Sequence, residues 1–170
     1  NTTRLGLLNS VVGALTTDSV TQPEKIANLA RTCTDLIRLA RENSAEPVQI
    51  TAASLSLARL QALGLSELNE ASRVAFLDAV RNKNNTVDAS NLPIPGGAST
   101  DAVDTYGELK TMASSYATLI AYADDHAGAA VPTASDYANV GVTWPASLPL
   151  STNAAALSLL NAAVKNGSAS

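Results

Sequence analysis

The only histidine of the chain, His126, follows two acidic residues in the order Asp124-Asp125-His126. A histidine beside carboxylates could bind a metal ion or exchange protons with a substrate. A zinc site needs three or four converging ligands, and no second histidine or cysteine lies at a ligand spacing from His126. We therefore expect His126 to lie at a solvated helix end, with Gly128 close behind it as a helix-terminating residue.

Cys33 is the second candidate for chemistry and the only cysteine, so the chain can form no internal disulfide. A nucleophilic cysteine needs a neighbouring base and a lowered pKa. Cys33 instead falls on a stripe of apolar residues at helical spacing, which favours a buried thiol in the core. A single cysteine suits a cytosolic protein and suits equally a large secreted bacterial protein.

Five acidic residues could bind calcium: Asp101, Asp104, Asp124, Asp125 and Asp136. A dedicated calcium loop places its oxygen ligands at short alternating positions, and none of these five residues has that spacing. Asp101 and Asp104 are better explained as charges at a helix N-terminus. The chain also lacks a phosphate-binding loop, a dinucleotide fingerprint and a hydrolase nucleophile motif. We expect no catalytic residue, no metal and no cofactor.

Two aromatic residues are candidates for contact with a ligand. Trp144 lies between Thr143 and Pro145, and Tyr106 lies soon after a stretch rich in Asn, Pro, Gly, Ser and Thr at 84–102. An exposed aromatic side chain could contact a protein or a glycan. The alternative for Trp144 is a loop anchor packed where two helical groups meet.

Composition narrows the function classes further. Hydrophobic residues make up 46% of the chain but aromatic residues only 4%, so the core must consist mainly of Ala, Leu and Val. Ala and Leu are strong helix formers. The net charge of −4 and the lack of a basic stripe argue against nucleic acid as a partner. No apolar run approaches the roughly 20 residues that cross a bilayer, so we expect no membrane insertion.

A short segment recurs three times, at 7–12, 76–81 and 159–164. Each copy has two large apolar residues, then Asn or Asp, then a small residue, then Val or Ala. The second and third copies lie farther apart in the chain than the first and second. A recurring segment of this kind is the sequence signature of a repeat protein.

A longer element recurs at 22–43 and 103–126. The two copies of this element are as far apart in the sequence as the second and third copies of the short segment. The apolar positions of the element recur with the period of one buried helical face. Pro23 suits the first turn of such a helix, and Thr21 with Glu24 has the spacing of a capping box. The matched apolar positions are Ile26, Leu29, Cys33, Leu36, Ile37 and Ala40 in the first copy, and Leu109, Met112, Tyr116, Leu119, Ile120 and Ala123 in the second.

A third, shorter element recurs at 60–66 and 137–143. The separation of its two copies in the sequence is intermediate between the two separations found for the short segment. Gly64 and Gly141 stand where a helix C-terminus requires a left-handed residue. Thr51 and Thr133 are the candidate N-caps of the two copies. Because these separations differ, the copies must differ by insertions, which we assign to the connections, chiefly at 84–102 and at 144–152. Two prolines within 144–152 exclude a continuous helix there.

These elements predict an all-α fold of tandem three-helix repeats, packed as antiparallel helical bundles. The first repeat covers 1–70, the second covers 71–152 with a loop insertion near 84–102, and 153–170 forms the first helix of a following repeat. A chain that starts and stops at the same element is expected of a piece of a longer array. The predicted core consists of Leu7, Leu8, Val11, Ile26, Leu29, Cys33, Leu36, Ile37, Leu63, Phe76, Leu77, Val80, Leu109, Met112, Tyr116, Leu119, Ile120, Val140, Leu159, Leu160 and Val164.

The segment from Asp136 to Thr143, followed by the stretches at 153–157 and 160–164, resembles a pattern of very long bacterial proteins. In that family Asp-Tyr or Asp-Leu, two residues, Gly-Val-Thr, a spacer, Asn-Leu-Ala and Asn-x-Ala-Val recur many times. A looser copy runs from Leu60 to Ser66 and continues with Asn69 and 74–80. The family comprises adhesin and hemolysin-type repeat proteins of Gram-negative bacteria, so the resemblance implies a stalk or spacer at the cell surface or outside the cell.

Three functions stay open at this point. The first is a non-catalytic structural spacer in a large cell-surface or secreted adhesin-like protein, whose partners are the neighbouring repeats of the same chain. The second is a helical binding module that recognises a host or surface protein or a glycan through Tyr106, Trp144 and the 84–102 stretch. The third is a helical-bundle enzyme or cofactor carrier, which needs converging polar residues inside the bundle, and the apolar stripes contain almost none.

Overall fold

The computed structural model describes residues 2–16, 20–40, 54–83, 105–145, 147 and 149–167. Within these residues the chain forms seven helices and no strand, so the predicted all-α class is confirmed. The helices, in chain order, are α1 (Thr2–Ala14), α3 (Pro23–Ala40), α4 (Leu57–Ala62), α5 (Glu70–Lys83), α6 (Tyr106–Ala123), α7 (Ala134–Asn139) and α8 (Ala154–Gly167). The predicted N-cap Thr51 and the 84–102 stretch lie outside the described residues.

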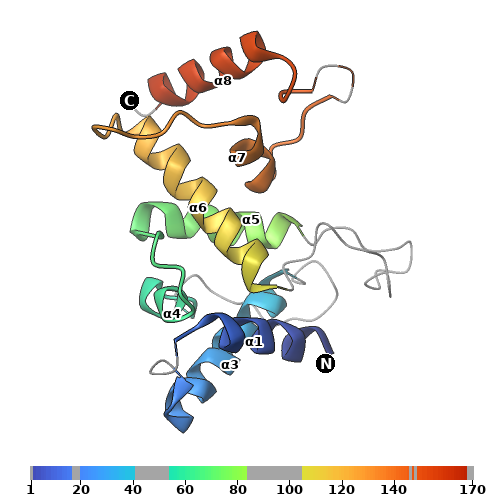
Figure 1. Cartoon of the computed structure of the whole chain (residues 1–170), viewed down its shortest axis with the longest axis vertical. Helices are drawn as coiled ribbons and strands as arrows, with labels where there is room; N and C mark the ends of the chain where they lie inside the picture. The colour runs from blue at the N-terminus through green and yellow to red at the C-terminus, as the bar shows by residue number, and fades with distance from the viewer. Residues whose placement is uncertain are drawn as a thin grey trace.

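The helices follow one another along the longest axis of the molecule (Figure 1). Helices α1, α3 and α4 lie at one end, α5 and α6 in the middle, and α7 and α8 at the other end. Two long helices organise the packing: α3 contacts α1, α4 and α5, and α6 contacts α5, α7 and α8. A further contact between α1 and α6 joins the two groups.

Helix α3 buries one face because its apolar residues recur at helical spacing. Leu29, Cys33, Leu36, Ile37 and Ala40 are all buried, as predicted. The predicted burial of Ile26 is wrong, because its side chain is 40% exposed. Residues 21–28 are exposed throughout, so the first turns of α3 extend beyond the helices that cover its second half.

Helix α6 has a well-defined beginning. The Thr105 hydroxyl accepts a hydrogen bond from the Glu108 backbone amide, and the Glu108 carboxylate accepts one in return from the Thr105 amide. This reciprocal capping box satisfies two amide groups that a helix otherwise leaves unpaired. Leu109 and Met112 are buried as predicted, whereas three predicted core residues further along, Tyr116, Leu119 and Ile120, are only half-buried.

The fully buried core lies mainly between α1, α3, α4 and α5, with the start of α6 closing it. The far end of the molecule is covered less. The predicted burial of Leu159 is wrong, because 74% of its side chain is exposed. Helix α8 packs on α6 with one face, and Leu159 lies outside that face. Four more predicted core residues are half-buried, namely Leu8, Val140, Leu160 and Val164.

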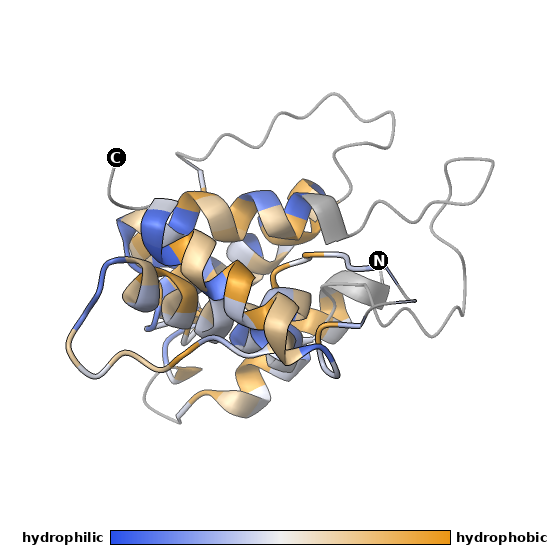
Figure 2. Cartoon of the chain, turned by 90° about the horizontal axis from the view of Figure 1, so that it is seen from above, coloured by the Kyte–Doolittle hydropathy of each residue, from blue (hydrophilic) through white to orange (hydrophobic). Residues whose placement is uncertain are grey.

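Hydropathy along the helices agrees with this packing. Seen from above, hydrophobic and hydrophilic segments alternate along the helices, as amphipathic helices require (Figure 2). Helix α3 separates its apolar from its polar residues most clearly, whereas α1 hardly does so. How fully an apolar residue is covered therefore depends also on the number of neighbouring helices.

Candidate functional site

The two residues first considered for catalysis lie in different places, His126 at the surface and Cys33 in the core. His126 is exposed in the turn after α6, and its backbone amide donates to the Ala121 carbonyl at 3.0 Å. The left-handed residue of this helix end is Asp125, with φ of 53°. Cys33 is buried, and its burial raises the pKa of the thiol to about 11. The thiolate that a nucleophile needs is therefore scarce at neutral pH.

The acidic residues that the structure describes do not gather into a site. Asp124 and Asp125 are exposed, and Asp125 forms an ion pair with Lys165 of α8 at 2.6 Å. Asp136 lies in the first turn of α7, while Asp101 and Asp104 lie outside the described residues. Within the part of the chain that the structure describes, no three His, Cys, Asp or Glu side chains lie close enough to hold a metal ion. No described helix is long and apolar enough to cross a membrane.

Tyr106 lies against the core at the first turn of α6. Its hydroxyl donates to the Gly64 carbonyl at 3.3 Å, and its backbone amide donates to the Ser10 hydroxyl of α1 at 3.0 Å. Trp144 follows the turn after α7, and 39% of its side chain is exposed. The structure therefore does not bring the two predicted ligand-contact residues together through any contact, and Tyr106 joins α6 to the earlier helices.

A pair of buried polar side chains joins α7 to α8. The Tyr137 hydroxyl donates to the Asn161 Oδ1 atom at 2.6 Å. The Asn161 side-chain amide donates to the Pro132 carbonyl at 3.1 Å. Both side chains are buried, so each hydrogen bond satisfies a polar atom that water cannot reach.

Asp136 links the start of α7 to α6. Its carboxylate accepts hydrogen bonds from the Thr133 amide at 2.8 Å and the Thr133 hydroxyl at 2.7 Å, which completes a capping box and confirms Thr133 as the N-cap. The other carboxylate oxygen accepts from the Ser115 hydroxyl of α6 at 3.0 Å. Burial by itself raises the pKa of Asp136, but the hydrogen bonds from Thr133 and Ser115 outweigh it and hold the pKa below its ordinary value.

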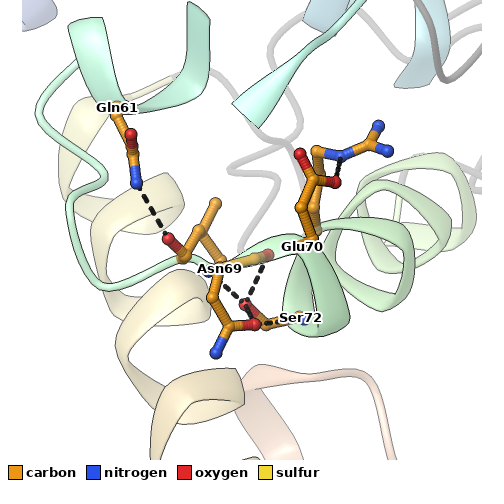
Figure 3. Close-up of polar contacts among 6 residues, drawn as sticks. Gln61, Asn69, Glu70 and Ser72 are labelled. Atoms are coloured by element: carbon orange, nitrogen blue, oxygen red, sulfur yellow. Dashed lines mark hydrogen bonds and ion pairs between the residues drawn. The ribbon is translucent and has the colours of Figure 1, made fainter. Parts of the chain in front are cut away.

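A comparable arrangement marks the start of α5 (Figure 3). The Ser72 amide donates to Asn69 Oδ1 at 2.9 Å, and the Asn69 amide donates to the Ser72 hydroxyl at 2.9 Å. Gln61 of α4 donates to the Leu68 carbonyl at 3.2 Å and so holds the connection between the two helices. At the start of α8 the Ala156 amide donates to Asn153 Oδ1 at 3.0 Å. Asn69 and Asn153 therefore cap two different helices in the same way.

Two basic residues join elements that lie far apart in the sequence. Arg59 of α4 donates to the Asp35 carboxylate of α3 at 2.8 Å and to the Thr32 hydroxyl at 3.2 Å. Lys110 of α6 donates to the Gly64 carbonyl at 2.9 Å and forms an ion pair with Glu67. Burial raises the pKa of Glu67, but the hydrogen bond from Lys110 contributes most to a net lowering.

Sequence reasoning missed the pairing of Tyr137 with Asn161 and the role of Arg59. A signal was available for Asn161, because a polar residue within a segment otherwise apolar needs a buried partner. Asp136, Tyr137, Gly141 and Asn153 all belong to the motif that carried the family resemblance. Each of them has a structural task in this fold: a capping box, a buried hydrogen bond, a left-handed turn and an N-cap.

Comparison of the chain with models of protein families, with curated proteins and with solved structures finds no match.

Proposed function

We propose that this chain is a tandem array of three-helix repeats and serves as a non-catalytic structural spacer in a large cell-surface or secreted bacterial protein of the adhesin type. The observation that supports the proposal is a pattern of helix contacts that recurs along the chain. The proposal matches α1 with α5 and α8, α3 with α6, and α4 with α7.

The packing of the helices supports this correspondence. Helix α1 packs on α3 as α5 packs on α6, and α3 packs on α4 as α6 packs on α7. Helix α3 then packs on α5 as α6 packs on α8. A repeat protein is expected to reuse its interfaces in this way, since each unit buries its apolar face against its neighbours.

The turns after α4 and α7 match in detail. Gly64 and Gly141 both have a positive φ, of 87° and 90°. The residue after each glycine donates its amide to a carbonyl five residues earlier: Leu65 to Leu60 at 3.3 Å, and Val142 to Tyr137 at 2.9 Å. These bonds are those of a Schellman motif, which ends a helix at a left-handed residue.

The polar links between the long and short helices also fall at matched positions. Ser115 of α6 and Thr32 of α3 coincide when the elements at 103–126 and 22–43 are aligned on their apolar stripes. Asp136 and Arg59 each stand directly before the shorter repeated element. Arg59 donates to Thr32, and Asp136 accepts from Ser115. The two positions keep their contact although the charge has changed sign, which supports a common architecture over a chance likeness.

A spacer function agrees with where the polar side chains are used. The motif residues stabilise helix ends and helix joints, and no cluster of described residues presents groups that converge on a metal ion. A spacer requires a stable, repeatable fold and no reactive site. The acidic, cysteine-poor composition fits a module that stays folded and dispersed outside the cell.

The test is the size and the location of the native protein. An antibody raised against this chain is used to blot fractions of the cells that produce it. We expect a band far larger than the 17.4 kDa of this chain, at the cell surface or in the medium. A cytoplasmic band near 17.4 kDa would contradict the spacer, and the repeat would then be an internal duplication.

The partly exposed Trp144 favours a second candidate, a helical module that binds a protein or a glycan with Trp144 at the contact. A glycan array and purified host surface proteins serve as probes for the wild-type chain and for Trp144→Ala. If a probe binds and Trp144→Ala loses the binding with its helicity intact, the module function is favoured. The variant Tyr106→Ala tests binding less cleanly. It is expected to lower the stability of the fold, because the Tyr106 hydroxyl bonds to Gly64.

A further inference from the structure

The outer face of α8 carries an apolar residue at a position that the other helices of its class bury. Leu159 corresponds to Leu7 of α1 and to Phe76 of α5, which are both fully buried, whereas Leu159 is 74% exposed. Two other matched sites change in the opposite direction. Leu5 and Val74 are exposed where Leu157 is half-buried, and Asn9 and Asp78 are exposed where Asn161 is buried, so α8 packs with a different face from α1 and α5. Leu159 therefore departs from a pattern that α1 and α5 share.

The turn after α7 is likewise more exposed than its counterpart, the turn after α4. A Cβ atom on Gly64 would lie 2.6 Å from the Tyr106 hydroxyl, so α6 covers this turn closely. A Cβ atom on Gly141 would meet no described atom within 4 Å. The next residue agrees, because Leu65 is fully buried and its counterpart Val142 is 40% exposed.

Trp144 provides a third departure. It is the third residue after Gly141, as Glu67 is after Gly64, and Glu67 pairs with Lys110 of α6. Helix α6 therefore covers the turn after α4, whereas the matching turn after α7 is exposed. We call the four residues Gly141, Val142, Trp144 and Leu159 the open surface.

We propose that the open surface forms a single face and binds one amphipathic α-helix of the α6 type, supplied by a further repeat of the same kind. This inference rests on the proposed repeat. The occupant is defined by chemistry: an apolar stripe at the spacing of Leu109 and Met112 covers Leu159, and a polar N-terminal turn reaches the carbonyl of Gly141 as Tyr106 and Lys110 reach that of Gly64.

A second copy of the chain is a poorer occupant. Among the described residues, the two helices of the required type are α3 and α6. The apolar residues needed, from Leu29 onward in α3 and at Leu109 and Met112 in α6, are already buried within their own molecule. A second copy would have to open its core to offer either of them. A helix of a further repeat would have an apolar stripe that is not yet buried. It could cover α8 with that stripe as α6 covers α5.

The experiment joins a second copy of residues 85–126, which carry the connection and α6, directly to Gly167 in place of the last three residues, 168–170. Residue Gly167 corresponds to Asn84, so the added segment follows α8 in the same register as α6 follows α5. Trp144 is the only tryptophan, and the added segment contains none. We expect the Trp144 emission to shift to shorter wavelength, its quenching by iodide to fall and the unfolding midpoint to rise.

The variant Leu159→Asp of the extended chain should lose these three effects, because a carboxylate at the centre of the interface remains without a partner. The matched control is Val74→Asp, an exposed apolar residue of α5 at a site that is exposed in α1 as well. The control should keep all three effects. In the unextended chain Leu159→Asp should leave the emission unchanged.

An unchanged emission and midpoint in the extended chain would overturn the proposal. So would a dimer of the unextended chain, detected by sedimentation and abolished by Leu159→Asp, because a second copy would then cover the surface. These results are independent of the spacer test. A small cytoplasmic parent protein would remove the spacer function and the further repeat together, whether or not the added helix docks. Failed docking in the extended chain would leave a large surface protein, and so the spacer function, unaffected.

Discussion

At the scale of single residues, the polar side chains of this chain act mainly on the backbone. Asp136 accepts hydrogen bonds from Thr133 at the start of α7 and from Ser115 on α6. Asn161 pairs with Tyr137 and with a backbone carbonyl. A residue type that could take part in catalysis or metal binding is used here to close helix ends and to join helices.

Replacing Asp136 should lower the stability in a pH-dependent manner. The folded-state pKa of Asp136 lies below its ordinary value, so its stabilising effect is complete above the ordinary carboxyl pKa of about 4 and is lost as the pH falls through the folded-state value. Asp136→Asn should cost about 1 kcal/mol at pH 7, from weaker hydrogen bonds to Thr133 and Ser115. Urea unfolding at a series of pH values measures both effects.

The variant should also lose stability less steeply than the wild type below about pH 4. Asp124→Asn is the matched control, because Asp124 is exposed in the turn after α6 and should leave the urea midpoint nearly unchanged. Equal acid dependence of wild type and Asp136→Asn would show that other carboxylates, such as Glu67, account for it.

Removing the Tyr137 hydroxyl should cost about 1–3 kcal/mol, because Asn161 Oδ1 would stay buried without a donor. Tyr137→Phe keeps the ring and its packing, so the loss reports the hydrogen bond. Urea unfolding of Tyr137→Phe, Asn161→Ala and the double variant gives the coupling between the two residues. Additive losses would mean that the bond contributes little to the joint between α7 and α8.

At the scale of elements, the two long helices have the same position in the packing but different degrees of coverage. The second half of α3 is mostly buried, while the second half of α6 is half-buried. The glycine turns show the same difference, because α6 covers Gly64 and no described atom approaches the Cβ direction of Gly141.

Alanine at the two glycines should separate backbone strain from packing. Gly141→Ala should cost about 1–2 kcal/mol, the penalty of a side chain at positive φ. Gly64→Ala should cost more, because its Cβ atom would also lie 2.6 Å from the Tyr106 hydroxyl. Thermal or urea unfolding of the two variants measures the difference.

The extra cost at Gly64 should shrink in a Tyr106→Phe background, which removes the hydroxyl that the new Cβ atom meets. The control is Gly141→Ala in the same background, whose cost should stay as it is in the wild type. If Gly64→Ala and Gly141→Ala cost the same, α6 does not press on the first turn in solution.

At the scale of the whole molecule, stability is distributed unevenly along the long axis. The core cluster gathers residues from α1, α3, α4, α5 and the first half of α6. Helix α8 has one buried side chain, Asn161, and it packs mainly on α6 (Figure 1). Regions with few buried apolar contacts open more easily than the core.

Hydrogen exchange should follow this distribution. Amide protons of α3 and α5 should exchange slowest, and those of α7 and α8 should exchange much faster, through local opening that leaves the core folded. Exchange followed by mass spectrometry on the intact chain measures each helix. Equal protection of α8 and α3 would contradict the uneven core and would require another cover for Leu159.

The sequence by itself determined the local features of this protein. The all-α class, the Thr133 cap and the turns at Gly64 and Gly141 follow from residue types and spacings within a few residues. The apolar stripe of α3 from Leu29 onward follows from the period of the helix. Such features depend only on residues close together in the sequence, so they can be predicted without knowing how the helices pack.

Only the tertiary structure decided which apolar faces are covered and which polar residues meet. Ile26 and Leu159 fit their helical stripes, yet both are exposed, because burial depends on whether another helix lies opposite. Tyr106 was a candidate for ligand contact by its type, whereas its hydroxyl bonds to Gly64, 42 positions earlier in the chain. The partner of a side chain across such a separation is set by helix packing, which the pattern of one segment does not contain.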